Sequence, residues 1–215
     1  FVNYKFKKKK MKKILLTSIV GLLSLNIANC QIFSEDFNTG IPATFTLTDV
    51  DATPPAANVA TYTGSFTAQN VGGEDCAGST SWLNPVGQAD DWMATPLITI
   101  PNTSAPVSLS FDAIAPDVSF PDGVEVYVST TGAAPADFLG SSAVYNTTTT
   151  GGESSVWTTR VVDLSSFYGQ DIYIAFRNNS NDQYILGIDN IIVKELQDND
   201  AALFSAEIDD VLAGN

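Results

Sequence analysis

The sequence contains no histidine, and this absence excludes the commonest catalytic arrangements. A Ser-His-Asp triad, a Cys-His pair and the usual proton shuttle near neutral pH all need an imidazole. A zinc site is also disfavoured, because zinc prefers nitrogen and sulfur ligands. A glycosidase needs only two carboxylates, and the 24 acidic residues offer many pairs. No pair stands in a recognisable active-site motif, so we predict a non-catalytic protein, with a secreted peptidase or glycosidase, or an accessory domain of one, as the alternative.

Cysteine is scarce, with only Cys30 and Cys76 in the chain. Cys30 ends an apolar segment that is described below as an export signal, and its removal would leave Cys76 without an intrachain disulfide partner. No lysine or arginine lies near Cys76 in the sequence to lower the pKa of its thiol. We therefore interpret Cys76 as a small buried or loop residue rather than a reactive one.

Basic residues are rare outside the N-terminus. Seven of the ten are lysines in the first thirteen positions, and only Arg160, Arg177 and Lys194 follow, against 24 acidic residues. These three against 24 give residues 31–215 a net charge of −21. Such a charge repels nucleic acid and anionic lipid, so we expect neither nucleic-acid binding nor membrane binding through a basic patch. Because 44% of the residues are hydrophobic, the chain is too apolar for an intrinsically disordered class.

The segment 11–30 has the three parts of a secretory signal peptide. A cationic start at Met11 is followed by a 15-residue apolar run and by small residues up to Cys30. Four polar side chains interrupt the run, which is shorter than the roughly 20 apolar residues of a membrane span. Residues 1–10 are interpreted as an over-extended reading frame. The sequence therefore predicts a secreted or cell-surface protein, with lipidation at Cys30 as the alternative to cleavage.

From residue 31 onward, apolar and polar residues alternate with the period of β-strands rather than helices. The pattern predicts half-buried strands, with one face toward a core and one toward water, at 107–113, 124–129, 156–162 and 172–177. Further strands are expected at 32–37, 44–49, 58–63, 91–99 and 184–194, and long loops at 52–58, 69–90 and 133–155. The predicted fold is an all-β sandwich of the jelly-roll type, with no substantial helix after the signal.

The domain is predicted to span 31–196, and the tail 197–215 has a different character. An acidic linker there precedes a new strand-like pattern at 202–211. A single strand cannot bury a face without a partner, so the tail is either an edge strand or the start of a second module. We favour a truncated second module with a poorly packed C-terminus.

Five segments of the chain resemble the cleaved-adhesin family, also described as choice-of-anchor J domains. They are SEDFNTGIP (34–42), DDWMATPLI (90–98), the stretch FDAIAPDVSFPDGVEVYVSTTG (111–132), WTTRVVDLSSFYGQDIYIAFRN (157–178) and YILGIDNIIV (184–193). The resemblance implies a sandwich of the galactose-binding or MAM-like kind in a longer, secreted multidomain protein. It also implies adhesion to extracellular glycans or to host or matrix proteins, with calcium ions that fasten loops. The tail resembles the start of an Ig-like module.

The resemblance implies calcium at two places. One gathers Asn38 and Asp49 with Asp189; the other is the loop that holds Asp117 and Asp122. The sequence departs from the family at the first place, because Asn38 stands where the family often has Glu and a fuller acidic loop is missing after Asp49. An acid-rich chain without histidine nevertheless suits Ca²⁺, which prefers oxygen ligands.

Each of these acids has a plainer interpretation as well. Asp117 and Asp122 are typical turn-forming residues whose carboxylates accept backbone hydrogen bonds. Asp189 lies in an apolar strand, where a carboxylate needs a partner or a metal unless it is exposed at a sheet edge. Among the tryptophans, Trp92 is interpreted as a core residue and Trp82, in a loop rich in Gly and Ser, as a candidate for stacking on a sugar.

Overall fold

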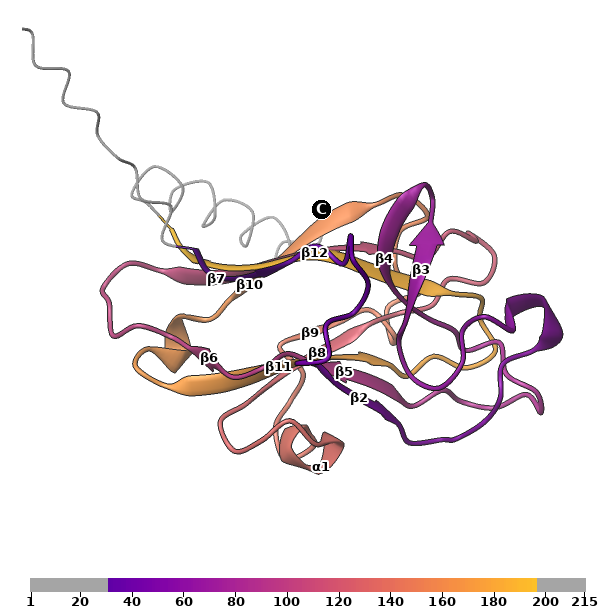
Figure 1. Cartoon of the computed structure of the whole chain (residues 1–215), viewed down its shortest axis with the longest axis horizontal. Coiled ribbons are helices and arrows are strands. Elements are labelled where there is room, and N and C mark those ends of the chain that lie inside the picture. The colour runs from indigo at the N-terminus through magenta and orange to yellow at the C-terminus, as the bar shows by residue number, and fades with distance from the viewer. Residues whose placement is uncertain (1–30, 197–215) are drawn as a thin grey trace, which may run out of the picture.

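The computed structural model describes residues 31–196 as two antiparallel β-sheets packed face to face (Figure 1). The first sheet has the order β10 (Thr158–Asp163), β7 (Val107–Ile114), β12 (Leu186–Glu195), β4 (Glu74–Ser79), β3 (Thr67–Val71), and β1 (Gln31–Glu35) also pairs with β12. The second has the order β2 (Thr46–Asp49), β5 (Asp91–Ala94), β11 (Asp171–Asn178), β8 (Glu125–Ser129), β9 (Tyr145–Asn146), and β6 (Ile98–Thr99) also pairs with β11. The predicted all-β sandwich is confirmed.

The main core lies between the two sheets and follows from the alternation seen in the sequence. Leu109 and Phe111 of β7 face Ile174 and Phe176 of β11, and all four are fully buried. The rings of Phe111 and Phe176 meet edge to face with centroids 5.1 Å apart. Burying an aromatic or aliphatic side chain of this size contributes about 1.5–3 kcal/mol, so this layer stabilises the sandwich.

The outer face of the second sheet is covered, contrary to the prediction of a water-facing side. Every residue of β5 and β8 is buried. The short helix α1 (Pro135–Phe138) places Phe138 against Trp92, with ring centroids 5.8 Å apart, and Tyr127 also packs on Trp92, with centroids 5.5 Å apart. The central strands are therefore buried on both faces, and Trp92 is buried as expected, although in this outer cluster rather than between the sheets.

Two segments differ from the sequence prediction. The predicted strand 58–63 is replaced by the 3-10 helix η1 (Ala57–Val59) and the turn that follows it. Val59 at the end of η1 and Tyr62 after the turn are both buried. The predicted loop 69–90 contains most of a hairpin, β3 and β4, joined at Gly72 and Gly73, whose φ angles are 63° and 96°. A two-residue Gly-Gly turn is a known hairpin signal, so this hairpin was readable from the sequence.

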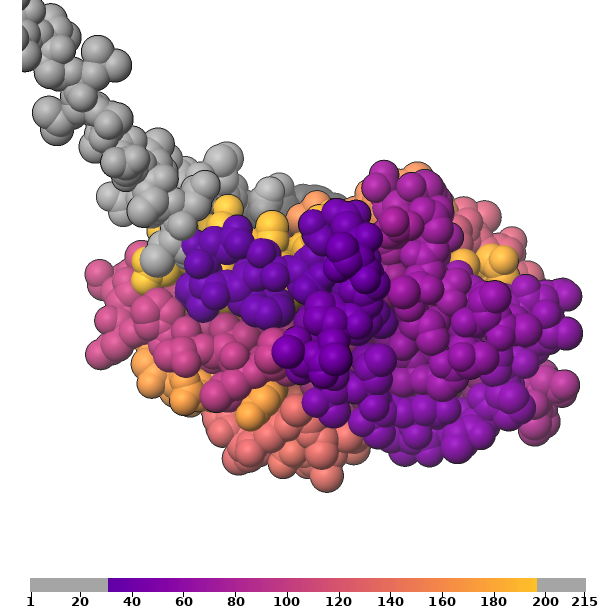
Figure 2. Space-filling model, in the orientation of Figure 1, coloured from indigo at the N-terminus to yellow at the C-terminus, as the bar shows by residue number. Residues whose placement is uncertain are grey.

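Three smaller differences concern the other segments. The predicted strand 91–99 is interrupted between β5 and β6, and the predicted loop 133–155 contains α1 and β9. The 3-10 helix η2 (Ser165–Phe167) joins β10 to β11. Between β1 and β2 the chain crosses from the first sheet to the second over the front of the molecule (Figure 2).

Cys76 is buried on β4, as expected, and burial together with the charge of Asp189 raises the pKa of its thiol to about 12. A thiol in this state is inert. The helices between residues 31 and 196 are all too short to cross a membrane. The interpretations of 1–10 and of the signal 11–30 concern residues outside the described range, as does that of the tail 197–215.

Candidate cation centre and aromatic groove

Three aspartates from two adjacent strands converge at one end of the second sheet. Asp49 ends β2, Asp51 follows it, and Asp91 begins β5, where the antiparallel register places it directly opposite Asp49. Carboxylate oxygens of the three lie within 4.8 Å of one another. We call Asp49, Asp51 and Asp91 the acidic cluster.

The loop after β2 is shaped by its own aspartates. Asp49 accepts a hydrogen bond from the Ala52 N–H at 2.7 Å, and Ala52 adopts a left-handed φ of 51°. Asp51 accepts one from the Thr53 N–H at 2.9 Å and one from the Asp90 N–H at 2.7 Å. These bonds hold the carboxylates in place and leave oxygen lone pairs for a further ligand.

A fourth carboxylate, Asp122, lies next to this cluster and is fully buried. Its Oδ1 accepts a hydrogen bond from the Ser81 hydroxyl at 2.5 Å, but its Oδ2 has no hydrogen-bond partner. The Ser79 hydroxyl donates to Asp91 at 2.7 Å and accepts from the Asn178 amide at 3.1 Å. The Oδ2 of Asp122 is thus a buried oxygen without a hydrogen-bond partner, which is rare, and the charge of Asp122 acts on Asp91.

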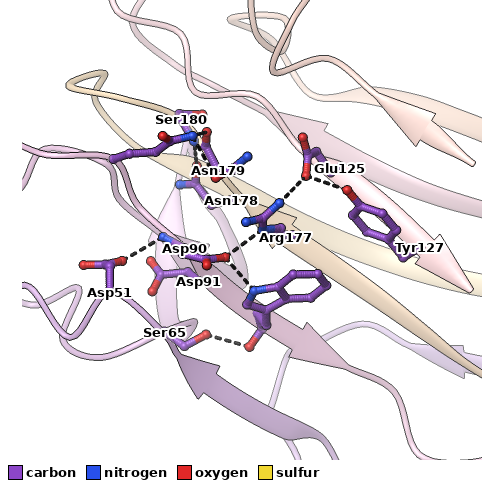
Figure 3. A network of polar contacts seen from close by, with 12 residues as sticks. Asp51, Ser65, Asp90, Asp91, Glu125, Tyr127, Arg177, Asn178, Asn179 and Ser180 are labelled. Atoms are coloured by element: carbon purple, nitrogen blue, oxygen red, sulfur yellow. Dashed lines mark hydrogen bonds and ion pairs between the residues drawn. The ribbon is translucent and has the colours of Figure 1, made fainter. Parts of the chain in front are cut away.

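Arg177 forms ion pairs with acids outside the acidic cluster. Arg177 binds Asp90 at 2.7 Å and Glu125 at 2.9 Å (Figure 3). Its guanidinium lies 4.8 Å from the centre of the Trp92 ring. Asp90 immediately precedes β5 and Asp91 begins it, and of the two only Asp90 is paired with Arg177. Within residues 31–196, no ion pair between side chains compensates the acidic cluster.

Burial and mutual repulsion disfavour the ionised state of these carboxyls. Burial is the main cause that raises the pKa of Asp91 to about 8, and the charges of Asp49, Asp51 and Asp122 add to it. Burial also raises the pKa of Asp122 to about 7. Without a cation, part of the cluster is therefore protonated near neutral pH.

These raised pKa values predict how stability depends on pH in a chelating buffer. An unfolded aspartate titrates near pH 4, so between about pH 4 and pH 8 the folded protein holds more protons than the unfolded one. The free energy of unfolding should therefore fall as the pH rises through this range. Melting curves in EGTA should give a higher melting temperature at pH 5 than at pH 8, and Asp91→Asn should flatten the difference. A melting temperature that rises over this interval would contradict the prediction.

A separate groove of about 520 Å³ opens on the surface beside Trp82. We call it the aromatic groove, and its lining also includes Asn58, Asp117, Phe120, Asp182, Gln183 and Tyr184. The Trp82 and Tyr184 rings meet edge to face with centroids 6.0 Å apart. Phe120 stands 54% exposed at this groove. The arrangement combines apolar ring surface with hydrogen-bonding side chains, as small-molecule sites do.

A family model for the Cleaved Adhesin Domain matches residues 30–193. The chain belongs to this family. Crystal structures of the K1 and K3 Cleaved Adhesin domains of Lys-gingipain from Porphyromonas gingivalis W83 are similar to it, with TM-scores of 0.59 and 0.55 at 23% and 24% identity. The matches cover 77% and 76% of this chain and 98% and 97% of those domains. Among curated proteins, none matches the sequence.

This cleaved adhesin domain does not bring Asn38, Asp49 and Asp189 into one site. Asp49 belongs to the second sheet and Asp189 to β12 of the first, while Asn38 is exposed after β1. The Asp189 carboxylate accepts hydrogen bonds from the backbone and side chain of Asn190, at 2.7 and 3.2 Å. Its pKa is raised to about 6, chiefly by burial. Asp189 thus has a hydrogen-bond partner within its own strand, and it lies in a different sheet from Asp49.

Asp117 and Asp122, the residues of the second predicted site, differ in their surroundings. Asp117 accepts a hydrogen bond from the Ser119 N–H at 2.8 Å, as a turn-forming residue does, and lines the aromatic groove. The carbonyl of Phe120 accepts from the Tyr184 N–H and so is engaged, whereas Asp122 turns into the interior beside Asp91. The two aspartates of the predicted loop site thus have different surroundings, one at the surface groove and one in the interior.

Sequence reasoning missed Asp51 and Asp91 as members of the cluster. Asp51 was not singled out, and Asp91 appeared only within the segment 90–98 that resembles the family. The available signal was a pair of acids, Asp90 and Asp91, at the start of a strand. Their meeting with Asp49 depends on the pairing of β2 with β5, which joins positions about 40 residues apart.

Proposed function

We propose that this cleaved adhesin domain is a secreted or cell-surface binding module without catalytic activity, and that it is part of a longer multidomain protein. We further propose that a calcium ion at the acidic cluster stabilises it. Membership of the family supports the adhesive role. The observation that carries the calcium proposal is the convergence of three carboxylates beside a fourth, buried one with an unpaired oxygen.

The donor set fits calcium. Ca²⁺ takes about six to eight oxygen ligands from carboxylates, carbonyls and water, and every side-chain donor at the cluster is an oxygen. Asp49, Asp51 and Asp91 would hold the ion, with Asp122 near enough to contribute charge. A bound cation would offset the repulsion among these acids and fasten the loop after β2 to the start of β5.

The same geometry argues against catalysis by these carboxyls. A glycosidase would need a carboxyl with a raised pKa within reach of its substrate. Asp91 and Asp122 have raised pKa values, but they are 3% and 0% exposed, so a polymeric substrate cannot reach them. Their chemistry is suited to holding a cation.

A combined retention and turnover assay tests the proposed function. The purified protein, in buffers with calcium and with EGTA, is applied to immobilised polysaccharides and matrix proteins, and soluble products are measured in parallel. We expect calcium-dependent retention on at least one surface with no release of reducing ends or peptides. Release of products that grows with protein concentration would show a hydrolase instead.

A further inference from the structure

A second groove adjoins the aromatic groove and has a different chemical character. It measures about 530 Å³ and is lined by Pro121, Gly152, Ser180 and Asn181, among others. Gln183 lines both grooves, and Phe120 of the first is followed in the chain by Pro121 of the second. We call the two adjoining grooves together the cleft; one offers ring surfaces and the other offers amide and hydroxyl groups.

The cleft is held in shape without a ligand. The Thr80 hydroxyl donates to the Tyr184 carbonyl at 2.5 Å and accepts from the Trp82 N–H at 3.1 Å. The Tyr184 N–H donates to the Phe120 carbonyl at 3.0 Å. These bonds tie the three aromatic positions together, so little conformational entropy would be lost when a ligand binds.

A hydrogen bond from the interior of the sandwich also holds the cleft in shape. The Ser81 hydroxyl, which donates to the buried carboxylate of Asp122, also accepts a hydrogen bond from the Gln183 N–H at 2.9 Å. Gln183 is the residue shared by the two grooves. The middle of the cleft is thereby anchored to the interior of the sandwich.

The exposed apolar surface at the cleft points to contact with a ligand. Phe120 is 54% exposed and Val118, on the same loop, is 77% exposed. An aromatic ring left open beside a groove contributes little to stability, but it offers a flat face for a ligand that is apolar on one side. The neighbouring side chains of Asn58, Asp182 and Gln183 offer donors and acceptors within the same groove.

Charge narrows the class of ligand. Asp117 and Asp182 line the aromatic groove, and among residues 31–196 no lysine or arginine lines either groove. With the net charge of −21 beyond residue 30, an anionic polymer would be repelled. Sugar rings without charge combine apolar CH faces, which pack on aromatic rings, with hydroxyls that bond to carboxylates and amides.

We propose that the cleft formed by the two grooves binds an uncharged oligosaccharide, with one sugar ring on Trp82 and Phe120 and the next toward Gln183 and Asn181. Two adjoining grooves of about 520 and 530 Å³ favour a chain of several sugars over a single one. This inference rests on the proposed function and names its ligand class and its site.

Affinity electrophoresis and calorimetry of the purified protein, with calcium present, test this site. The probes are four uncharged polysaccharides, galactan, mannan, xylan and glucan, and two anionic ones, alginate and heparin. The protein should bind at least one uncharged polymer and neither anionic one. Phe120→Ala and Trp82→Ala should each weaken that binding tenfold or more.

A matched control separates the site from a general surface effect. Leu139, near α1, is 55% exposed, close to the value for Phe120, but lines neither groove. Leu139→Ala should bind as the unchanged protein does, and the melting temperature of Phe120→Ala should stay within about 2 °C of it. Because Trp82 is partly buried, Phe120→Ala decides the question if Trp82→Ala unfolds.

Each contrary outcome has a distinct meaning. If an uncharged polymer binds but Phe120→Ala leaves its affinity unchanged, the cleft is not the site and the proposed binding function survives. A cationic side chain could also pack on the rings. If no polysaccharide binds, but a lysine-rich peptide binds and Phe120→Ala weakens its binding, the proposed ligand class is overturned. If polysaccharide is cleaved, the proposed non-catalytic function fails.

Discussion

Arg160→Met is expected to lower the free energy of unfolding by about 3 kcal/mol, because it leaves the carboxylate of Glu153 buried without its cation. The Glu153 side chain is 0% exposed and binds the Arg160 guanidinium at 2.7 Å. Tyr145 and Thr147 also donate to it, at 2.9 and 2.8 Å. For a domain of this size the melting temperature should fall by roughly 6–12 °C. Urea titration and thermal melting, monitored by circular dichroism, measure both quantities.

The control for this prediction is the double variant Arg160→Met with Glu153→Gln. The amide still accepts a hydrogen bond from Tyr145 or Thr147 but carries no charge, so the double variant should recover about half of the lost stability. A change below about 0.5 kcal/mol for Arg160→Met alone would show that the ion pair contributes as little as an exposed one.

Saturating calcium is expected to stabilise the protein by about 2.7 kcal/mol at 100 times the dissociation constant. The melting temperature at pH 7.5 should then be roughly 5–10 °C higher in calcium than in EGTA. Asp51→Asn and Asp91→Asn should each remove most of this shift, since both residues belong to the acidic cluster. In EGTA, Asp91→Asn should be at least as stable as the unchanged protein, because it replaces a buried group that resists ionisation.

Two aspartates outside the cluster provide matched controls for the calcium response. Asp117 lies at the aromatic groove, and Asp189 is bonded to Asn190 on the other sheet. Asp117→Asn and Asp189→Asn should keep the full calcium shift. Loss of the shift in either one, with retention in Asp91→Asn, would place the ion elsewhere.

Much of the sandwich follows from local alternation in the sequence. Strands β7 and β11 were predicted because Leu109 and Phe111, like Ile174 and Phe176, recur at every second position. The hairpin of β3 and β4 was missed because its small and polar residues looked like loop. The burial of both faces of β5 and β8 was missed because it depends on Phe138, which arrives from a helix outside the sheet.

The candidate site was less predictable for a related reason. Asp49 was singled out through the family resemblance, but its neighbour Asp91 is defined by strand register and not by spacing in the sequence. Adjacent acids such as Asp90 and Asp91 have opposite surroundings, one beside Arg177 and one beside Asp49. The local sequence pattern does not show which of the two adjacent aspartates faces Asp49, because only the pairing of β2 with β5 brings Asp49 close.

Calorimetric titration of calcium into the chelator-free protein at pH 7, in two buffers of different ionisation enthalpy, tests the central claim most directly. Metal binding requires ionised carboxylates, and Asp91, with a pKa of about 8, is mainly protonated beforehand. We predict saturable binding that releases about one proton per ion and that Asp91→Asn abolishes. Binding that is unaffected by Asp91→Asn, or whose heat is the same in both buffers, would contradict it.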